Sequence, residues 1–180
     1  MNFRPQLRHM GLLVWDMPTM ELFYSKVLGM MVSDRGRVPR LDNREIVFLS
    51  SSPEDHHQLV LLAGREGKGP SVVQQLSFEV KTLAELREMH ARLTQSSAAE
   101  IRPISHGNSW SLYSTDPEGN GLEVYADTPW HVGQPQTHPL DLSLPDDDIL
   151  AATHASMKSD PTFAPYDEWV ARMSVVLTQP

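Results

Sequence analysis

The chain has 180 residues, 40% of them hydrophobic and 21% charged, and these ordinary values exclude a fibrous or wholly disordered protein. Its 15 Lys and Arg against 23 Asp and Glu give a formal charge of −8, which opposes binding to a nucleic-acid backbone. Cysteine is absent, so disulfides and thiolate sites are excluded and any metal must be held by His, carboxylate or amide oxygen.

The first third of the chain predicts a strand, a helix and three further strands. The apolar run at 7–14 is typical of a strand. Asp16 and Pro18 indicate the start of a helix, and Gly29 indicates its end. Strands are then expected near 32–33, 45–50 and 58–62.

The same order of elements returns about 66 residues later. The run at 72–80 predicts a strand, and Thr82 with Glu85 forms a capping box that starts a helix. The expected buried stripe of this helix is Leu83, Leu86, His90 and Leu93. Strands follow near 101–104, 109–114 and 121–126, with a turn at 116–121. This internal repeat predicts two similar βαβββ modules, at about 5–65 and 70–127, with a shared concave surface.

Charge and proline content change near Asp127. Residues 1–125 hold 13 basic and 15 acidic side chains, whereas 126–180 hold 2 and 8, together with 7 of the 14 prolines. We therefore expect a body over 1–127 and an acidic, proline-rich extension over 128–180. In that extension we expect Trp130 to pack onto the body, the acids at 146–148 to begin a helix, and a last short helix to start near Tyr166.

The repeated strand–helix–strands pattern, ending in DPEGNGLEVY, resembles the vicinal oxygen chelate superfamily, which includes glyoxalase I, bleomycin-resistance proteins and extradiol dioxygenases. The resemblance covers about residues 5–127, and the hairpin YSTDPEGNGLEVY is its most specific part. It implies an α+β fold in which two βαβββ modules form a curved mixed sheet around a central cleft for one divalent metal and the substrate. The C-terminal extension lies outside it.

The resemblance also implies three metal ligands: His9 on the first strand, Gln75 on the equivalent strand of the second module, and Glu123 on the last strand. Three such ligands leave coordination positions open for a substrate with two adjacent oxygens. Gln75 stands where extradiol dioxygenases usually have His, and glyoxalase-like members do use Gln there. An amide oxygen favours Mn, Mg or Zn relative to Fe(II). The alternative is a core histidine, a surface carboxylate and a glutamine that caps a polar pocket without metal.

Three further residues match positions around the substrate in extradiol dioxygenases. The resemblance implies that His57 transfers protons, whereas His106 and Tyr113 orient the substrate oxygens. Strand alternation places Tyr113 and Ser111 on one polar face. The alternation leaves open whether His56 or His57 points inward.

The leading hypothesis is an extradiol dioxygenase that cleaves a catechol-type ring with Fe(II) and O2. The first alternative is a glyoxalase-like isomerase or lyase with a redox-inert metal, to which Gln75 is better suited. The second is a non-catalytic protein that binds a small molecule, as bleomycin-resistance proteins do.

The expected partners are a small aromatic or vicinal-oxygen substrate and, by analogy with the superfamily, a second copy of the chain in a homodimer. No apolar run is long enough to span a membrane, and the N-terminus does not read as a signal segment. We therefore expect a cytoplasmic protein with neither membrane nor nucleic-acid partners.

Overall fold

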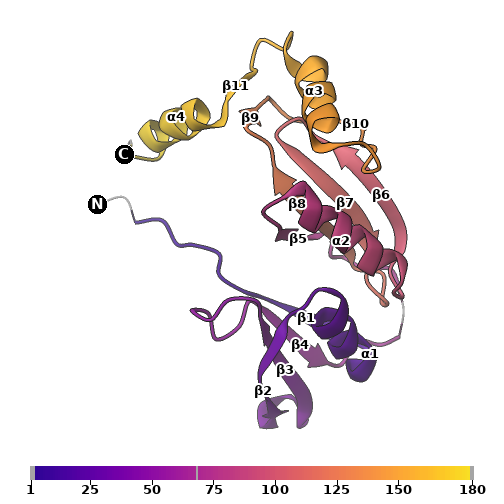
Figure 1. The fold of residues 1–180 in the computed structure, drawn as a ribbon. Coiled ribbons are helices and arrows are strands. Elements are labelled where there is room, and N and C mark those ends of the chain that lie inside the picture. Colours follow the sequence, from indigo (N-terminus) through magenta and orange to yellow (C-terminus); the bar gives the residue numbers. More distant parts are fainter. Residues whose placement is uncertain (1–2, 68, 179–180) are drawn as a thin grey trace.

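The structure is a computed structural model that describes residues 3–67 and 69–178 (Figure 1). The first module contains β1 (Met10–Val14), α1 (Met17–Leu22), a π-helical turn (Phe23–Val27), β2 (Met31–Val38), a 3-10 turn (Pro39–Leu41), β3 (Arg44–Ser50) and β4 (Leu59–Ala63). The second contains β5 (Leu76–Glu79), α2 (Leu83–Thr94), β6 (Ala99–Ser105), β7 (Ser109–Thr115) and β8 (Gly121–Asp127). The extension contains β9 (Trp130–His131), β10 (His138–Pro139), α3 (Asp146–Met157), β11 (Ala164–Pro165) and α4 (Tyr166–Thr178).

Each module forms its own mixed sheet, and the two sheets have the same topology. The strand orders are β1-β4-β3-β2 and β6-β7-β8-β5, with β10 added at the outer edge of the second sheet. The first strand of each module is parallel to the last, while the other pairs are antiparallel. The predicted α+β fold with two βαβββ modules is confirmed. Division of the chain at Asp127 stays a prediction.

The strands of the two modules pair in the same register, so positions in one module have equivalent positions in the other. Met10 pairs with Leu59 in the first module, and Leu76 pairs with Leu122 in the second. Both predicted strands begin later than the sequence indicated, because their parallel ladders with β4 and β8 start only at Met10 and Leu76. His9 and Gln75 therefore each lie directly before a strand rather than on it.

Local capping signals in the sequence are confirmed. The Asp16 carboxylate accepts a hydrogen bond from the Thr19 N–H at 3.1 Å and begins α1. The Thr82 hydroxyl accepts from the Glu85 N–H at 3.1 Å and begins α2. The Glu85 carboxylate reaches back to the N–H of Lys81, one residue before the cap.

One hydrophobic core runs through both modules, between the helices and the sheets. Met20 of α1 and Leu86 of α2 are fully buried in it. On α2 the buried stripe includes Met89, whereas His90 is only half-buried, so the predicted place of His90 on the stripe is wrong by one residue. Helix positions 89 and 90 flank the same stripe, and the apolar side chain takes the buried place.

A buried carboxylate joins the second module to the first. Glu118, in the turn between β7 and β8, accepts hydrogen bonds from the N–H groups of Trp15 and Asp16, each at 2.8 Å. Arg65, which follows β4, pairs with the same carboxylate at 3.2 Å. The Glu118 side chain is 1% exposed. The negative charge thus faces the N-terminus of α1, where backbone N–H groups have no acceptor within the helix.

Asp116 shapes this turn and adds a second link between the modules. Its carboxylate accepts from the N–H groups of Glu118 and Asn120, each at 2.9 Å. The Tyr24 hydroxyl, from the π-helical turn of the first module, donates to it at 2.9 Å. Burial, reinforced by the nearby Asp116 charge, raises the pKa of Tyr24, which keeps the hydroxyl a donor.

The extension packs on the second module through α3. The Trp110 indole N–H donates to the Thr153 hydroxyl at 2.9 Å, and Leu142 and Ile149 join the core. Arg87 of α2 donates to backbone carbonyls of the extension and pairs with Asp146 at 2.6 Å. This part of the extension therefore packs on the second module of the same chain.

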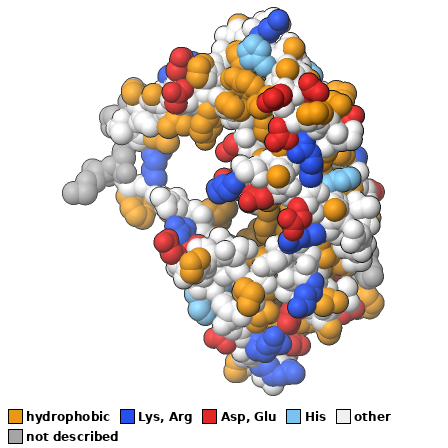
Figure 2. Space-filling view, in the orientation of Figure 1, with side chains coloured by type: hydrophobic (Ala, Val, Ile, Leu, Met, Phe, Trp, Pro, Cys, Tyr) orange, Lys and Arg blue, Asp and Glu red, His pale blue; other side chains and the backbone are white. Residues whose placement is uncertain are grey.

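Trp130 and α4 differ from expectation. Trp130 packs against His154 and Phe163 within the extension rather than on the body. The final helix α4 is 13 residues long instead of short, and none of its described side chains is buried. Figure 2 shows an opening between this part of the molecule and the body. None of the helices in the described residues is long and apolar enough to cross a bilayer.

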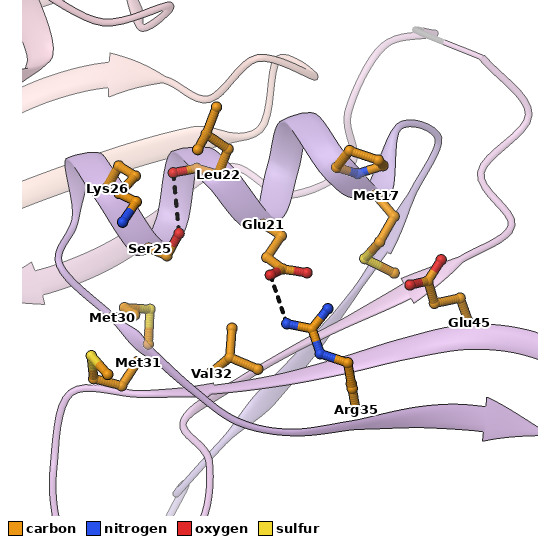
Figure 3. Close-up of a pocket in the computed structure, with 11 residues that line it drawn as sticks. Met17, Glu21, Leu22, Ser25, Lys26, Met30, Met31, Val32, Arg35 and Glu45 are labelled. Carbon is orange, nitrogen blue, oxygen red and sulfur yellow. Dashed lines mark hydrogen bonds and ion pairs between the residues drawn. The ribbon is translucent and has the colours of Figure 1, made fainter.

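The outer groove of the first module stays open, unlike its counterpart. A cavity of about 590 Å³ lies between α1 and β2. Figure 3 shows Glu21 and Arg35 facing each other there. Their ion pair has an N–O distance of 2.9 Å. In the second module β10 pairs with β6, and Leu142 of the extension packs into the core beside α2. The extension therefore covers the groove beside α2 in the second module, whereas the equivalent groove beside α1 in the first module stays exposed.

We predict that Glu118→Gln lowers the free energy of unfolding by about 2–4 kcal/mol, because it removes the charge that pairs with Arg65 and weakens two backbone hydrogen bonds at a buried site. Urea unfolding measures this change. Glu79→Gln, which disrupts an exposed pair with Lys81, serves as the control and should leave stability nearly unchanged. Equal stability of both variants would contradict a structural role for Glu118.

For the extension we predict that Ile149→Ala costs about 2–4 kcal/mol, because the side chain is 2% exposed within the core. Val176→Ala in α4, where the side chain is 54% exposed, should change stability by less than about 0.5 kcal/mol. Thermal and urea unfolding of both variants check the difference. Similar effects of the two substitutions would mean that α3 is not docked as the structure places it.

Candidate active site

A polar row crosses the face of the second sheet opposite α2. Ser77 of β5 pairs in register with Glu123 of β8, Glu123 with Tyr113 of β7, and Tyr113 with Arg102 of β6. Register partners point to the same side of a sheet, so these four side chains form one line. Leu112 and Leu122, which directly precede Tyr113 and Glu123 in the sequence, point to the opposite face of the sheet, into the core.

Glu123 lies at the centre of this row as a buried carboxylate with neutral hydrogen-bond partners. Its side chain accepts from the Ser77 hydroxyl at 2.6 Å and from the Gln75 amide at 2.9 Å. The residue is 8% exposed, and no Lys, Arg or His of the described residues forms an ion pair with it. Since a buried charge without a counter-charge is costly, a cation would be stabilised here.

Gln75 joins the same cluster from the segment just before β5. Its amide nitrogen donates both to Glu123 and to the Ser77 hydroxyl, at 2.9 and 3.0 Å. A half-turn of the amide would direct its oxygen toward a cation held by the same carboxylate. Two of the three predicted metal ligands are therefore in direct contact.

His9 lies on the other side of the cleft. It is exposed, precedes β1, and its ring centroid lies 4.4 Å from that of His57. A cavity of about 720 Å³ separates the modules, with Met10 and Gln58 on one wall and Gln75 on the other. Nowhere in residues 3–67 and 69–178 do three His, Asp or Glu side chains converge in a cluster that could hold a metal. The donor types fit a divalent ion, and the third ligand would come from the segment before β1.

His57 lies in the turn before β4, not on that strand as the sequence indicated, since β4 begins at Leu59. His57 is half-buried against the ring of Phe48, whereas its neighbour His56 is exposed. Burial, followed by the neighbouring His9 and His56, lowers the pKa of His57 below its usual 6.5. A neutral imidazole at pH 7 can accept a proton from a substrate hydroxyl.

His106 and Tyr113 form a hydrogen-bonded pair beside Glu123. His106 Nε2 lies 2.9 Å from the Tyr113 hydroxyl, and Nδ1 lies 2.5 Å from the backbone oxygen of Gln136 in the extension. Because a carbonyl only accepts, Nδ1 carries the proton and Nε2 accepts from the tyrosine. Burial and the adjacent Glu123 carboxylate raise the pKa of Tyr113 to about 12, so the phenol stays protonated.

The structure thus brings the six predicted residues together in three contacts: Gln75 with Glu123, His9 with His57, and His106 with Tyr113. Sequence reasoning missed Ser77, Arg102 and Gln136. Ser77 shares a strand face with Gln75, which is a signal that alternation offers. Arg102 and Gln136 carry no such local signal, because each reaches the site through a pairing set by distant residues.

The chain is similar in sequence to proteins of a known family. Residues 6–124 match the family model of the Glyoxalase/Bleomycin resistance protein/Dioxygenase superfamily. Biphenyl-2,3-diol 1,2-dioxygenase 3 of Rhodococcus globerulus is 29% identical over 133 residues, covering 71% of this chain and 66% of the relative. The 2,2',3-trihydroxybiphenyl dioxygenase of Sphingomonas paucimobilis is 29% identical over 137 residues, covering 71% and 45%. The chain thus spans less than two thirds of the length of these relatives.

Solved structures share the fold. The fosfomycin resistance protein FosX of Listeria monocytogenes, complexed with Mn(II) and sulfate, superposes with a TM-score of 0.56 at 16% identity, over 70% of this chain and 95% of its own. A glyoxylase/bleomycin resistance protein/dioxygenase domain of Frankia sp. EAN1pec gives 0.58 at 22%, over 70% and 100%. The family match over most of the two βαβββ modules, together with this shared fold, shows that the chain belongs to the glyoxalase/bleomycin resistance protein/dioxygenase superfamily.

Proposed function

We propose that the protein is a metal-dependent dioxygenase that cleaves a catechol-type ring on the extradiol side. The observation that carries this proposal is Glu123, a buried carboxylate with neutral partners, flanked in one row by a protonated tyrosine. The relatives named as biphenyl-diol dioxygenases support the choice of chemistry.

The metal would be held by His9, Gln75 and Glu123, whose imidazole, amide oxygen and carboxylate suit a divalent ion. When bound, Fe(II) would bind the two substrate oxygens and O2 and relay electrons from the catechol, which is oxidised, to O2, which is reduced. Ser77 steadies the carboxylate through its 2.6 Å hydrogen bond and so fixes the direction in which Glu123 offers its oxygens.

Proton movements fall to the side chains around this cluster. His57, neutral at pH 7, accepts a proton from a catechol hydroxyl as the substrate enters. The Tyr113 phenol stays protonated, and its one O–H, which donates to His106 Nε2 in the free protein, would turn to a substrate oxygen when the substrate enters. His106 holds Tyr113 in place, and Gln136 O fixes the tautomer in which His106 can do so.

The cleft between the modules suits an aromatic substrate. Its cavity of about 720 Å³ has apolar walls that include Leu7, Met10 and Phe78, with the polar Gln75 and Ser77 at one side. An apolar chamber with a few convergent polar groups is typical of small-molecule sites. Gln75 and Ser77 connect this cavity to Glu123, which is not itself one of the lining residues.

A glyoxalase-like isomerase or lyase with a redox-inert metal is the second candidate, and Gln75 is the observation that favours it. The amide is a harder donor than the imidazole usual in extradiol dioxygenases. Such an enzyme would use the same Glu123 and Gln75 but would not consume O2.

We predict that protein reconstituted anaerobically with Fe(II) converts a catechol to a yellow product when O2 is added, with one O2 consumed per catechol. The panel contains catechol, 2,3-dihydroxybiphenyl and carboxylated catechols, and absorbance and oxygen uptake are measured together. Zn, Mn and Mg serve as controls, with Zn and Mg expected to give no product. Oxygen-independent turnover with Zn would favour the isomerase or lyase, while ligand binding with no turnover and no retained metal would favour a binding protein.

For the site residues we predict that Glu123→Gln reduces bound metal from about one per chain to near zero, because the only carboxylate of the ligand set is lost. His57→Gln should retain the metal and lower kcat by about 10²–10⁴-fold, the usual range for loss of a general base. His90→Gln on α2, a histidine outside this cluster, is the control and should keep kcat within about threefold. Metal analysis and steady-state kinetics measure both, and equal loss in the two histidine variants would exclude the role given to His57.

A further inference from the structure

We propose that Arg102 binds the anionic substituent of the substrate, so that the enzyme prefers catechols that bear a carboxylate. This proposal rests on the proposed function, because it names the substrate class of the same site. Arg102 lies at the end of the polar row, paired in register with Tyr113, which is paired in turn with Glu123. Its guanidinium therefore lies on the same face of the sheet as the proposed metal ligand.

Among residues 3–67 and 69–178 the Arg102 guanidinium forms no ion pair. Five arginines form ion pairs, namely Arg8, Arg35, Arg65, Arg87 and Arg92, while Arg102 shares with Arg4, Arg37, Arg40, Arg44 and Arg172 the lack of a carboxylate partner among the described residues. Arg102 is exposed at the sheet surface. Its charge nevertheless reaches Tyr113, where it opposes the rise of the pKa of the phenol. An unpaired cation thus lies beside a residue of the site.

A small polar pocket lies between Arg102 and the start of β8. It has a volume of about 230 Å³, and Tyr113 forms part of its wall, as do Gln74 and Thr115. The guanidinium, the amide of Gln74 and the hydroxyl of Thr115 are donors suited to a carboxylate. Glu100 also lines the pocket and would weaken anion binding by repulsion.

The spacing along the row suits a ring that carries a short acidic arm. Arg102 and Glu123 are separated by two strand spacings, about 10 Å between their Cα atoms. A catechol whose oxygens face Glu123 would extend its opposite edge past Tyr113 toward Arg102. A carboxylate attached there, directly or through one or two methylenes, would meet the guanidinium.

The first module shows that this charge arrangement is not simply a property of the fold. Its equivalent row consists of Asp34, Phe48 and Val60, which pair in the same register on β2, β3 and β4. An acid stands where the second module has Arg102, and a valine stands where it has Glu123. The cation and the carboxylate ligand therefore occur together, in one module only.

The test compares kcat/KM for 3-(2,3-dihydroxyphenyl)propionate with that for neutral 2,3-dihydroxytoluene, using the Fe(II)-loaded full chain. The ratio should exceed one in the wild type, fall about 10–100-fold in Arg102→Gln, and rise in Glu100→Gln. Arg40→Gln, an exposed arginine in the turn before β3, is the control and should leave the ratio unchanged. An unchanged ratio in Arg102→Gln would overturn the proposal.

Failure of the dioxygenase proposal remains distinguishable, because the same two ligands can be titrated calorimetrically into Zn-loaded protein. Tighter binding of the acid, lost in Arg102→Gln and kept in Arg40→Gln, supports the anionic subsite even if no catechol is cleaved. Equal affinity for both ligands in the wild type, or equal loss in both arginine variants, rejects the subsite whether or not the ring is cleaved. Arg102→Lys, which keeps the charge but not the two-pronged hydrogen bonding, should retain part of the preference.

Discussion

The buried carboxylate of Glu118 is the interaction on which the geometry of the cleft depends. It accepts two backbone N–H groups at the start of α1 and pairs with Arg65, so one side chain of the second module is held by two segments of the first. β8 begins three residues later, at Gly121. The position of Glu123 relative to the first module is therefore set within a few residues of a rigid anchor, as the metal-ligand role proposed for it requires.

The pseudo-repeat explains why one site is proposed rather than two. His9 and Gln75 occupy equivalent positions before β1 and β5, while the counterpart of Glu123 in the first module is Val60. Both modules thus supply a neutral donor, but only the second supplies a carboxylate. Duplication of a βαβββ unit builds two similar walls, and in the proposed site the one carboxylate, Glu123, decides which wall would hold a cation.

Much of the fold could be predicted from local signals, because caps and turns act within a few residues. Asp16, Thr82 and the turn at 116–121 were recognised in this way. The role of Glu118 could not be, since its partners Trp15 and Asp16 lie about a hundred residues away. The proximity of Arg102 to Tyr113 was also hidden, because an irregularity in the pairing of β6 with β7 between Ala99 and Arg102 shifts the register, and simple alternation does not reveal the shift.

The extension takes part in the site although it lies outside the family match. The backbone oxygen of Gln136 fixes the tautomer of His106, and His106 in turn accepts the hydrogen bond that orients Tyr113. Gln136 is held between β9 and β10, and β10 pairs with the edge strand β6 just before His106. The docking of α3, through Ile149 and the bond between Trp110 and Thr153, anchors this segment. Packing of the extension and orientation of the phenol are therefore coupled, since loosening α3 would free the carbonyl that selects the histidine tautomer.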